Sequence, residues 1–168
     1  LLGAFYSKEE GDNYQYVALN QLDGSPLPAP WNDMATFEWA RSQAFVAPDA
    51  PTLDFTALQS VPSDQWPSVK LTAHPSLRVL SLHTDPRPTL RGEGAPTAAP
   101  TSLVIWRQGF EVFHAPIDDA EVTALRALLA GEVLPMVLAP FGDDATGAFE
   151  MLHGWFNEGM VSSIERGD

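Results

Sequence analysis

Residues 102–114 read SLVIWRQGFEVFH, two runs of strand-forming side chains joined through Arg107, Gln108 and Gly109. β-Branched and aromatic residues favour strands, and a short glycine-containing connection between two such runs is typical of a β-hairpin. We therefore expect strands over residues 102–106 and 110–114. Helical patterns follow this hairpin in the sequence, and further helix and strand patterns precede it.

Three helical patterns follow it. The first covers residues 120–130, with Asp118 available as N-cap and Gly131 in the position of a left-handed C-cap. A shorter helix is expected over residues 132–138. The third carries apolar residues at helical spacing and ends at Gly159. The predicted order is hairpin, helix, helix, helix.

The chain upstream of the hairpin begins with a weakly patterned arm, residues 1–29, that ends in a proline-rich turn. This arm is expected to pack through its aromatic residues, which are Phe5, Tyr6, Tyr14 and Tyr16. A helix then follows over residues 31–46, with Asn32 or Asp33 as its N-cap.

Residues 69–73 and 77–83 alternate apolar and polar side chains, which predicts two half-buried strands. They complete a segment of helix plus first strands over residues 30–84. Residues 85–101 carry four prolines and two glycines, so we expect a mobile, exposed loop. The predicted fold is α+β: a small antiparallel sheet, a winged-helix-like three-helix module within residues 102–168, and the N-terminal helix packed on it.

The net charge disfavours nucleic acids as partners. Twenty-two Asp and Glu against nine Lys and Arg give −13, and the cations are scattered singly along the chain. Such a surface repels polyanions, so we expect no nucleic-acid partner. Cysteine is absent, and no stretch approaches the ~18 apolar residues of a membrane span. A cytoplasmic location without membrane contact is therefore expected.

Catalytic and metal-binding patterns are also missing. The four histidines, His74, His83, His114 and His153, do not pair at metal-ligand spacing. No Gly-x-Ser-x-Gly turn or phosphate-cradling glycine loop occurs. The pairs Asp118–Asp119 and Asp143–Asp144 each precede a predicted helix, where aspartate caps the helix. We expect no enzyme activity, no cofactor and no metal.

Three segments carry a resemblance to a known family. They are FEWAR at 37–41, HPSLRVL at 74–80 and LVIWRQG at 103–109. In this order and spacing they resemble a bacterial family labelled as a DNA-binding domain. Its members accompany multinuclear non-haem iron oxygenases that modify Cys-containing precursor peptides, as in methanobactin-type pathways. The resemblance covers roughly residues 30–164.

The resemblance implies a non-catalytic partner subunit. Such a protein binds a ribosomally made precursor through its leader peptide and presents it to a TIM-barrel iron oxygenase. The helix–helix–helix order after the hairpin resembles the winged-helix-like elements that recognise leader peptides. In the first helix, Glu38, Trp39 and Arg41 are the expected contacts with the oxygenase.

An extended peptide is captured most simply as an added strand at a sheet edge, beside a helix that supplies side-chain pockets. The sequence does not decide which strand offers that edge. The expected peptide-binding residues lie on the third helix and the hairpin; they are Phe149, Leu152, Trp155, Phe156, Trp106 and Val112.

Periodicity favours core positions for Phe149 and Leu152. Trp155 and Phe156 are adjacent and point about 100° apart, so we expect one of them to be an exposed anchor. Trp106 has two open roles, packing on the first helix or contacting the peptide.

The alternative function is a winged-helix transcriptional regulator that binds DNA. A recognition helix needs Arg, Lys, Asn or Gln on its exposed face, and cations for the phosphates. The third helix offers Glu150, His153, Asn157 and Glu158 instead, which favours the peptide-binding hypothesis.

Overall fold

The computed structural model describes residues 4–6, 16–18 and 28–166, with side chains described from residue 28 onward. The chain is mixed α+β with small antiparallel sheets, as the sequence predicts. It forms two units, residues 1–42 with 80–101 and residues 43–79 with 102–168. The chain passes between them after Ser42, Val79 and Thr101.

The first unit contains most of helix α1 (Ala29–Phe45), the short helix α3 (Arg87–Leu90) and two paired strands. Strands β1 (Ala4–Tyr6) and β2 (Tyr16–Ala18) run antiparallel. The packing predicted for Phe5, Tyr6, Tyr14 and Tyr16 lies outside the described side chains.

Helix α1 begins earlier than the sequence predicts, so both candidate caps lie inside it. The backbone N–H groups of Trp31 and Asn32 donate to Pro28 O at 2.9 and 3.1 Å. Proline is tolerated in the first turn of a helix, which allows Pro30 to lie there. Asp33 therefore has another role: its buried carboxylate accepts bonds from the N–H and the hydroxyl of Thr84, both at 2.8 Å.

The proline-rich segment 85–101 has local structure in its first part. Besides α3, it contains a bridge in which Asp85 and Thr97 exchange backbone bonds of 2.8 and 3.0 Å. The Asp85 carboxylate also accepts a forked pair from Arg87, at 2.9 Å from Nε and 2.7 Å from Nη2. Most residues between 91 and 100 are exposed.

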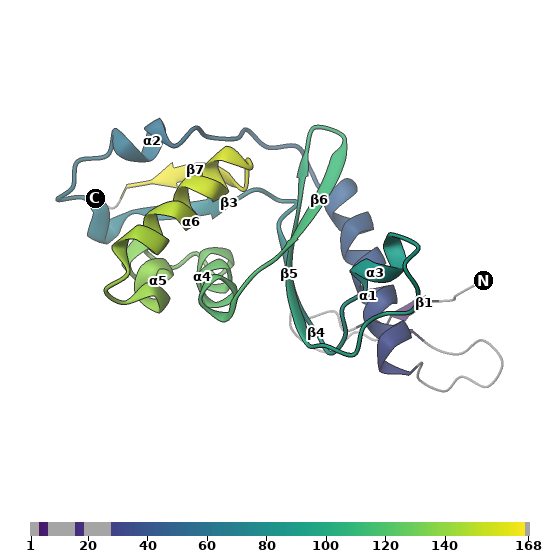
Figure 1. Cartoon of the computed structure of the whole chain (residues 1–168). Coiled ribbons are helices and arrows are strands. Elements are labelled where there is room, and N and C mark those ends of the chain that lie inside the picture. Colours follow the sequence, from purple (N-terminus) through teal and green to yellow (C-terminus); the bar gives the residue numbers. More distant parts are fainter. Residues whose placement is uncertain (1–3, 7–15, 19–27, 167–168) are drawn as a thin grey trace. The chain divides into compact units, whose positions relative to one another are not determined.

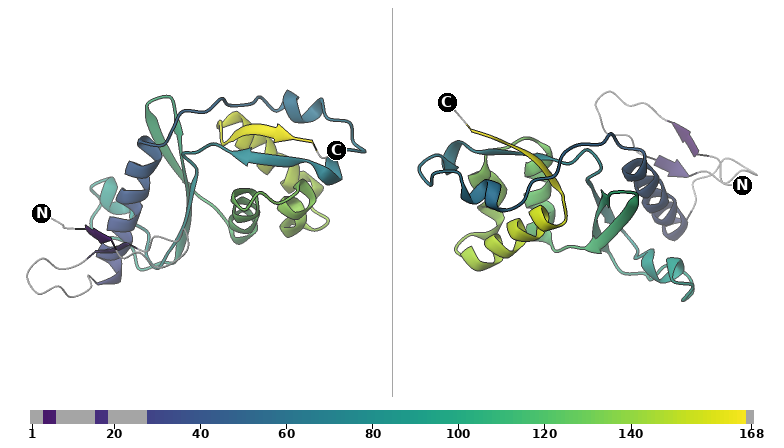
Figure 2. Two further views of the ribbon diagram at one scale, coloured as in Figure 1. Left: turned by 180° about the vertical axis from the view of Figure 1, so that it is seen from behind. Right: turned by 90° about the horizontal axis from the view of Figure 1, so that it is seen from above.

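Beyond the β1–β2 pair, the described strands form two antiparallel sheets in place of one. Strand β3 (Lys70–Ala73) pairs with β7 (Val161–Glu165), as Figure 2 shows from behind. Strands β4 (Arg78–Leu82), β5 (Thr101–Gln108) and β6 (Glu111–Pro116) form a three-stranded sheet in that order. The sequence does not predict β7, which is the strand that takes β3 as its partner.

The β5–β6 hairpin confirms the prediction for residues 102–114. Gln108 is opposite Glu111, so Gly109 and Phe110 alone form the loop. Gly109 has φ 57°, which a type II′ turn requires at its first loop position and which side chains rarely tolerate.

The three predicted helices are present as α4 (Asp119–Leu129), α5 (Leu134–Leu138) and α6 (Ala145–Asn157). Their predicted caps are confirmed: Asp118 Oδ1 accepts from Glu121 N at 2.8 Å, and Asp144 Oδ1 from Gly147 N at 2.9 Å. In the described part of the chain, no helix is long and apolar enough to cross a bilayer.

One hydrophobic core joins these helices to strands β3, β5 and β7. Helix α4 lies beside both β3 and α5 (Figure 1). The helix α2 (Thr56–Gln59) and the 3-10 helices η1 (Trp66–Ser68) and η2 (Ala139–Phe141) complete the unit. The most deeply buried members of this core include Leu58, Val69, Leu71, Leu77, Val104, Leu125, Leu128, Leu134, Val137, Trp155 and Val161.

We predict that Asp33→Ala destabilises α1 by about 1–3 kcal/mol, because the Thr84 donors lose a buried acceptor. Amide hydrogen exchange over α1 measures the change. Asp64→Ala, which removes an exposed carboxylate, is the control. Equal exchange rates in the two variants would show that the Asp33–Thr84 bonds contribute nothing.

Candidate functional site

The predicted peptide-binding residues of α6 are mostly buried. Leu152, Trp155 and Phe156 are 3, 2 and 3% exposed, whereas Phe149 is 52% exposed. The expectations of a core Phe149 and of one exposed anchor at Trp155 or Phe156 are therefore both wrong. Periodicity places an aromatic residue on a helix face but does not show which neighbours cover it.

Each of the two adjacent aromatics has its own partner. The Trp155 indole Nε1 donates to Glu121 Oε1 of α4 at 2.9 Å, and the Phe156 ring meets the edge of Phe55 at 5.5 Å. Burial raises the pKa of the Glu121 carboxyl, although the bond from Trp155 opposes the shift. The core therefore contacts α6 over a wider arc than a single apolar stripe.

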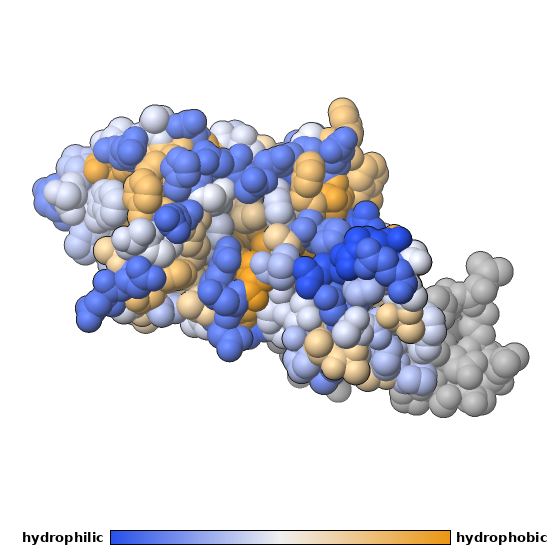
Figure 3. All heavy atoms as spheres, viewed as in Figure 1, coloured by the Kyte–Doolittle hydropathy of each residue, from blue (hydrophilic) through white to orange (hydrophobic). Residues whose placement is uncertain are grey.

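Phe149 instead forms a partly exposed aromatic patch with Phe55 and His153. Its ring meets Phe55 edge-on at 5.3 Å and stacks on His153 at 5.9 Å. Apolar side chains lie among hydrophilic ones on the face of the molecule that Figure 3 shows.

The hairpin residues do not join this patch. Trp106 is 6% exposed and stacks on Phe113 at 5.8 Å within the core of its own unit. Val112 is half-buried opposite Arg107. The six predicted residues therefore do not gather on one surface, and their role in peptide binding stays a prediction.

The expected oxygenase contacts lie on α1. Glu38 is exposed, Trp39 is half-buried, and the Arg41 guanidinium lies 5.8 Å from the centre of the Phe37 ring. Their role in contacting a partner also stays a prediction.

A groove of about 260 Å³ runs between the outer edge of β3 and the C-terminal end of α4. Its lining residues include Leu71, Leu77, Leu128, Leu129 and Gly131. We call it the strand-edge groove. The sequence points to the two elements separately, but nothing in it places α4 beside β3.

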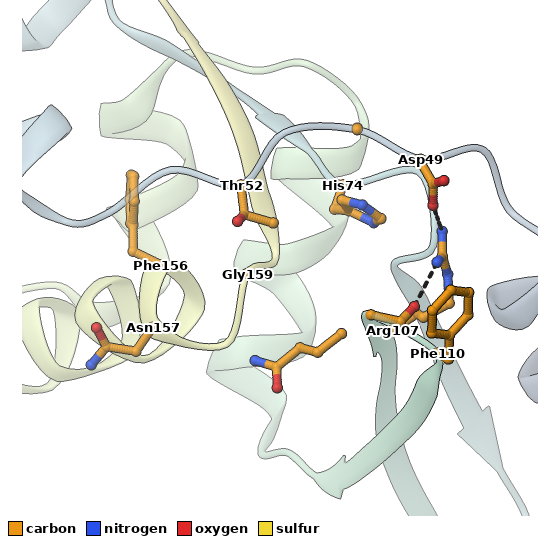
Figure 4. Close-up of a pocket in the computed structure, with 11 residues that line it drawn as sticks. Asp49, Thr52, His74, Arg107, Phe110, Phe156, Asn157 and Gly159 are labelled. Carbon is orange, nitrogen blue, oxygen red and sulfur yellow. Dashed lines mark hydrogen bonds and ion pairs between the residues drawn. The ribbon is translucent and has the colours of Figure 1, made fainter.

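A second, more polar groove of about 550 Å³ lies within the same unit, and Figure 4 shows its side chains. Arg107, Asp49 and His74 line it, together with Phe110 from the hairpin turn and Phe156 from α6. We call it the arginine groove. Arg107 is a charged residue near the end of a strand whose preceding residues are apolar, which is the one sequence signal that marks it.

A chain of hydrogen bonds fixes the buried side of the arginine groove. Ser76 N donates to His74 Nδ1 at 3.2 Å, so this nitrogen carries no proton. The Ser76 hydroxyl therefore donates to Nδ1 at 2.8 Å and accepts from Arg107 N at 3.0 Å. These residues belong to two of the three segments that carry the family resemblance.

His74 is held as a neutral imidazole. Burial lowers its pKa, and the positive charge of Arg107 lowers it further. A hydrogen bond with the Ala50 backbone and the negative charge of Asp49 raise the pKa, but their effect is smaller. A neutral ring suits the hydrogen-bond chain, because a proton on Nδ1 would confront two donors.

Within the described residues, no group of three His, Asp or Glu side chains is placed to hold a metal ion. No family model matches the chain, and no curated protein matches it.

We predict that His74→Gln flattens the pH dependence of stability between pH 7 and about 5.5. In the wild type, the unfolded chain binds a proton at an ordinary histidine pKa of about 6.5, which the folded chain binds only at lower pH. The free energy of unfolding therefore falls on acidification, by at most about 1.4 kcal/mol per pH unit. Urea unfolding at several pH values measures this slope, and identical slopes in both proteins would contradict the prediction.

Proposed function

We propose that this chain is a non-catalytic subunit that binds an extended precursor peptide and presents it to an iron-dependent peptide-modifying oxygenase. The observation that carries the peptide-binding part is the strand-edge groove, in which β3 lies beside the C-terminal end of α4. The oxygenase part rests on the family resemblance.

The β3 edge opposite β7 is bonded at its beginning to the chain that follows α4. Leu134 N donates to Val69 O at 2.7 Å, and Lys70 bridges to Val133. The backbone N–H and C=O groups of alternate residues in a strand point to the same edge. Those of Leu71 therefore point to the edge at which Val69 is bonded. There the strand-edge groove replaces a neighbouring strand. A peptide strand can continue the pairing that Val133 and Leu134 begin.

The walls of the strand-edge groove suit apolar side chains. Leu71, Leu77 and Leu128 are at most 2% exposed and form its base, while Leu129 is 47% exposed at its rim. Its volume is below that of typical small-molecule sites, about 300–1,000 Å³. One or two peptide side chains fit such a space better than a cofactor.

Arg78 leaves the strand-edge groove open. Its guanidinium Nη1 donates to Pro75 O at 2.7 Å and to Leu77 O at 2.8 Å, which holds the side chain against its own turn. An incoming peptide therefore does not have to displace an ion pair of Arg78 to reach the β3 edge.

The segments of the resemblance support the assignment through their places in the fold. FEWAR lies in α1, HPSLRVL joins β3 to β4, and LVIWRQG is β5 with its turn. We propose Glu38, Trp39 and Arg41 as contacts with the oxygenase. We also propose that the hairpin and α4–α6 are a winged-helix-like module.

A DNA-binding regulator is less well supported. The exposed positions of α6 include Glu150, His153 and Asn157, and its C-cap is the exposed Glu158, so none of these is a cation for phosphate contacts. Tight, salt-sensitive binding of random duplex DNA would favour the regulator over our proposal.

We predict that Leu129→Asp weakens binding of the precursor peptide encoded beside the gene by roughly tenfold. The variant replaces an apolar contact of about 1–2 kcal/mol with a hydrated charge. Fluorescence anisotropy of the labelled peptide measures the Kd.

Met136→Asp on α5 is the matched control, because Met136 is 55% exposed and does not line the strand-edge groove. Its Kd is expected to equal that of the wild type. If both variants bind equally, the groove is not the site; if the folded wild type does not bind, peptide capture is wrong.

We also predict that the chain co-purifies with the iron oxygenase encoded nearby and that the oxygenase modifies the precursor faster in its presence. A local rise in peptide concentration is the physical reason. The triple variant Glu38→Ala, Trp39→Ala, Arg41→Ala is expected to lose co-purification while still binding the peptide. Modification at the same rate without the chain would contradict the presenting role.

A further inference from the structure

Arg107 is a buried cation, and the only charged partner that it has among the described residues lies in solvent. The side chain is 9% exposed, whereas that of its ion-pair partner Asp49 is 93% exposed. The guanidinium Nη1 donates to Gly109 O at 2.7 Å, and Nη2 donates to Ala47 O at 3.1 Å and to Asp49 Oδ1 at 2.7 Å.

Burying a guanidinium is costly unless hydrogen bonds and a counter-charge compensate it. Two carbonyl oxygens accept hydrogen bonds from Arg107, but the counter-charge comes from a hydrated carboxylate. An ion pair with such a partner contributes little, because water screens it and solvates the free carboxylate. Asp49 also lies in a segment without helix or strand, so little holds it in this place.

The space around this ion pair is an open groove with aromatic walls (Figure 4). Phe110 lies at the hairpin turn and is 90% exposed, although a side chain of this size is normally at least partly covered. Phe156 lines another part of the groove, and Gln108 and Asn157 supply amide groups. A ligand that placed an apolar group against Phe110 would have its polar end within reach of Arg107.

We infer that the arginine groove binds a carboxylate attached to an apolar group, and that Asp49 occupies the place of this carboxylate when the groove is empty. The inference is independent of peptide binding at the strand-edge groove, because it uses different walls. The ligand's carboxylate would accept from Arg107 Nη2, and its apolar group would cover Phe110.

The charges favour a carboxylate over a phosphate. Asp49 itself demonstrates that a carboxylate oxygen reaches Nη2 at 2.7 Å. His74 is neutral and adds no second cation, so the groove matches a single negative charge. The net charge of −13 also opposes a dianion more strongly than a monoanion.

Two sources of this carboxylate differ in their chemistry. One is the C-terminus of a peptide that ends in an apolar residue; the other is the side chain of an Asp or Glu within a peptide. N-acetylphenylalanine represents the first. N-acetylglutamic acid α-amide, in which the α-carboxyl is amidated and only the side-chain carboxylate is free, represents the second. N-acetylphenylalaninamide, which lacks a carboxylate, is the negative probe.

The experiment titrates each probe into the full chain and follows the Arg107 Nε–H and Phe110 backbone signals by NMR. Asp49→Asn removes the internal competitor, so N-acetylphenylalanine is expected to bind about two- to fivefold more tightly than to the wild type. Phe110→Ala is expected to weaken it by a similar factor. The substitutions at these two exposed side chains leave the core intact.

Asp64→Asn is the matched control, since it removes the same charge at an exposed position outside the arginine groove. Preference for the acid over the amide, with tightening in Asp49→Asn only, would support the inference. Stronger binding of the glutamic acid α-amide would identify a side-chain carboxylate as the source. Equal tightening in both Asn variants, or no shift of either signal with folded Asp49→Asn, would overturn it.

Discussion

The pairing of β3 with β7 is the constraint on which the second unit depends. It joins residues 70–73 to residues 161–165 and encloses Leu71 and Val161 in the shared core. Ser162 reinforces the junction, because its hydroxyl donates toward Thr72 O at 3.1 Å and Ala73 O at 3.2 Å where the register shifts. A two-stranded ladder has two outer edges, and this one has Leu53 N bonded to Val161 O on the β7 side. The edge that faces α4 has Leu134 N bonded to Val69 O at its beginning and lines the strand-edge groove beyond it.

A short polar chain has a comparable effect around the arginine groove. Ser76 bonds to His74 within one turn and to the backbone of Arg107 in β5, so it ties the connection after β3 to the hairpin. A buried hydroxyl with both its donor and its acceptor roles satisfied fixes the relative position of these segments. The side chain of Arg107 is thereby directed at the groove by contacts that do not involve its charge.

Local structure was predictable where the signal lies within a few residues. The hairpin, the caps at Asp118 and Asp144 and the turn glycines followed from propensity and capping chemistry. Contacts between distant residues were not. Asp33 is of a residue type that commonly caps helices, but its carboxylate accepts hydrogen bonds from Thr84. Trp155 is covered because Glu121 on another helix accepts its indole N–H. The strand-edge groove arises from the same kind of contact, because no sequence pattern in β3 or α4 indicates that these two elements lie side by side.

The order in which β3 and β7 are synthesised has a consequence for how the protein folds in the cell. Strand β3 leaves the ribosome long before Val161–Glu165 has been translated, so until then both of its edges lack a strand partner. Pairing between segments so distant in sequence is slow, and exposed strand edges promote association between nascent chains. The second unit therefore completes its core only after β7 has been translated.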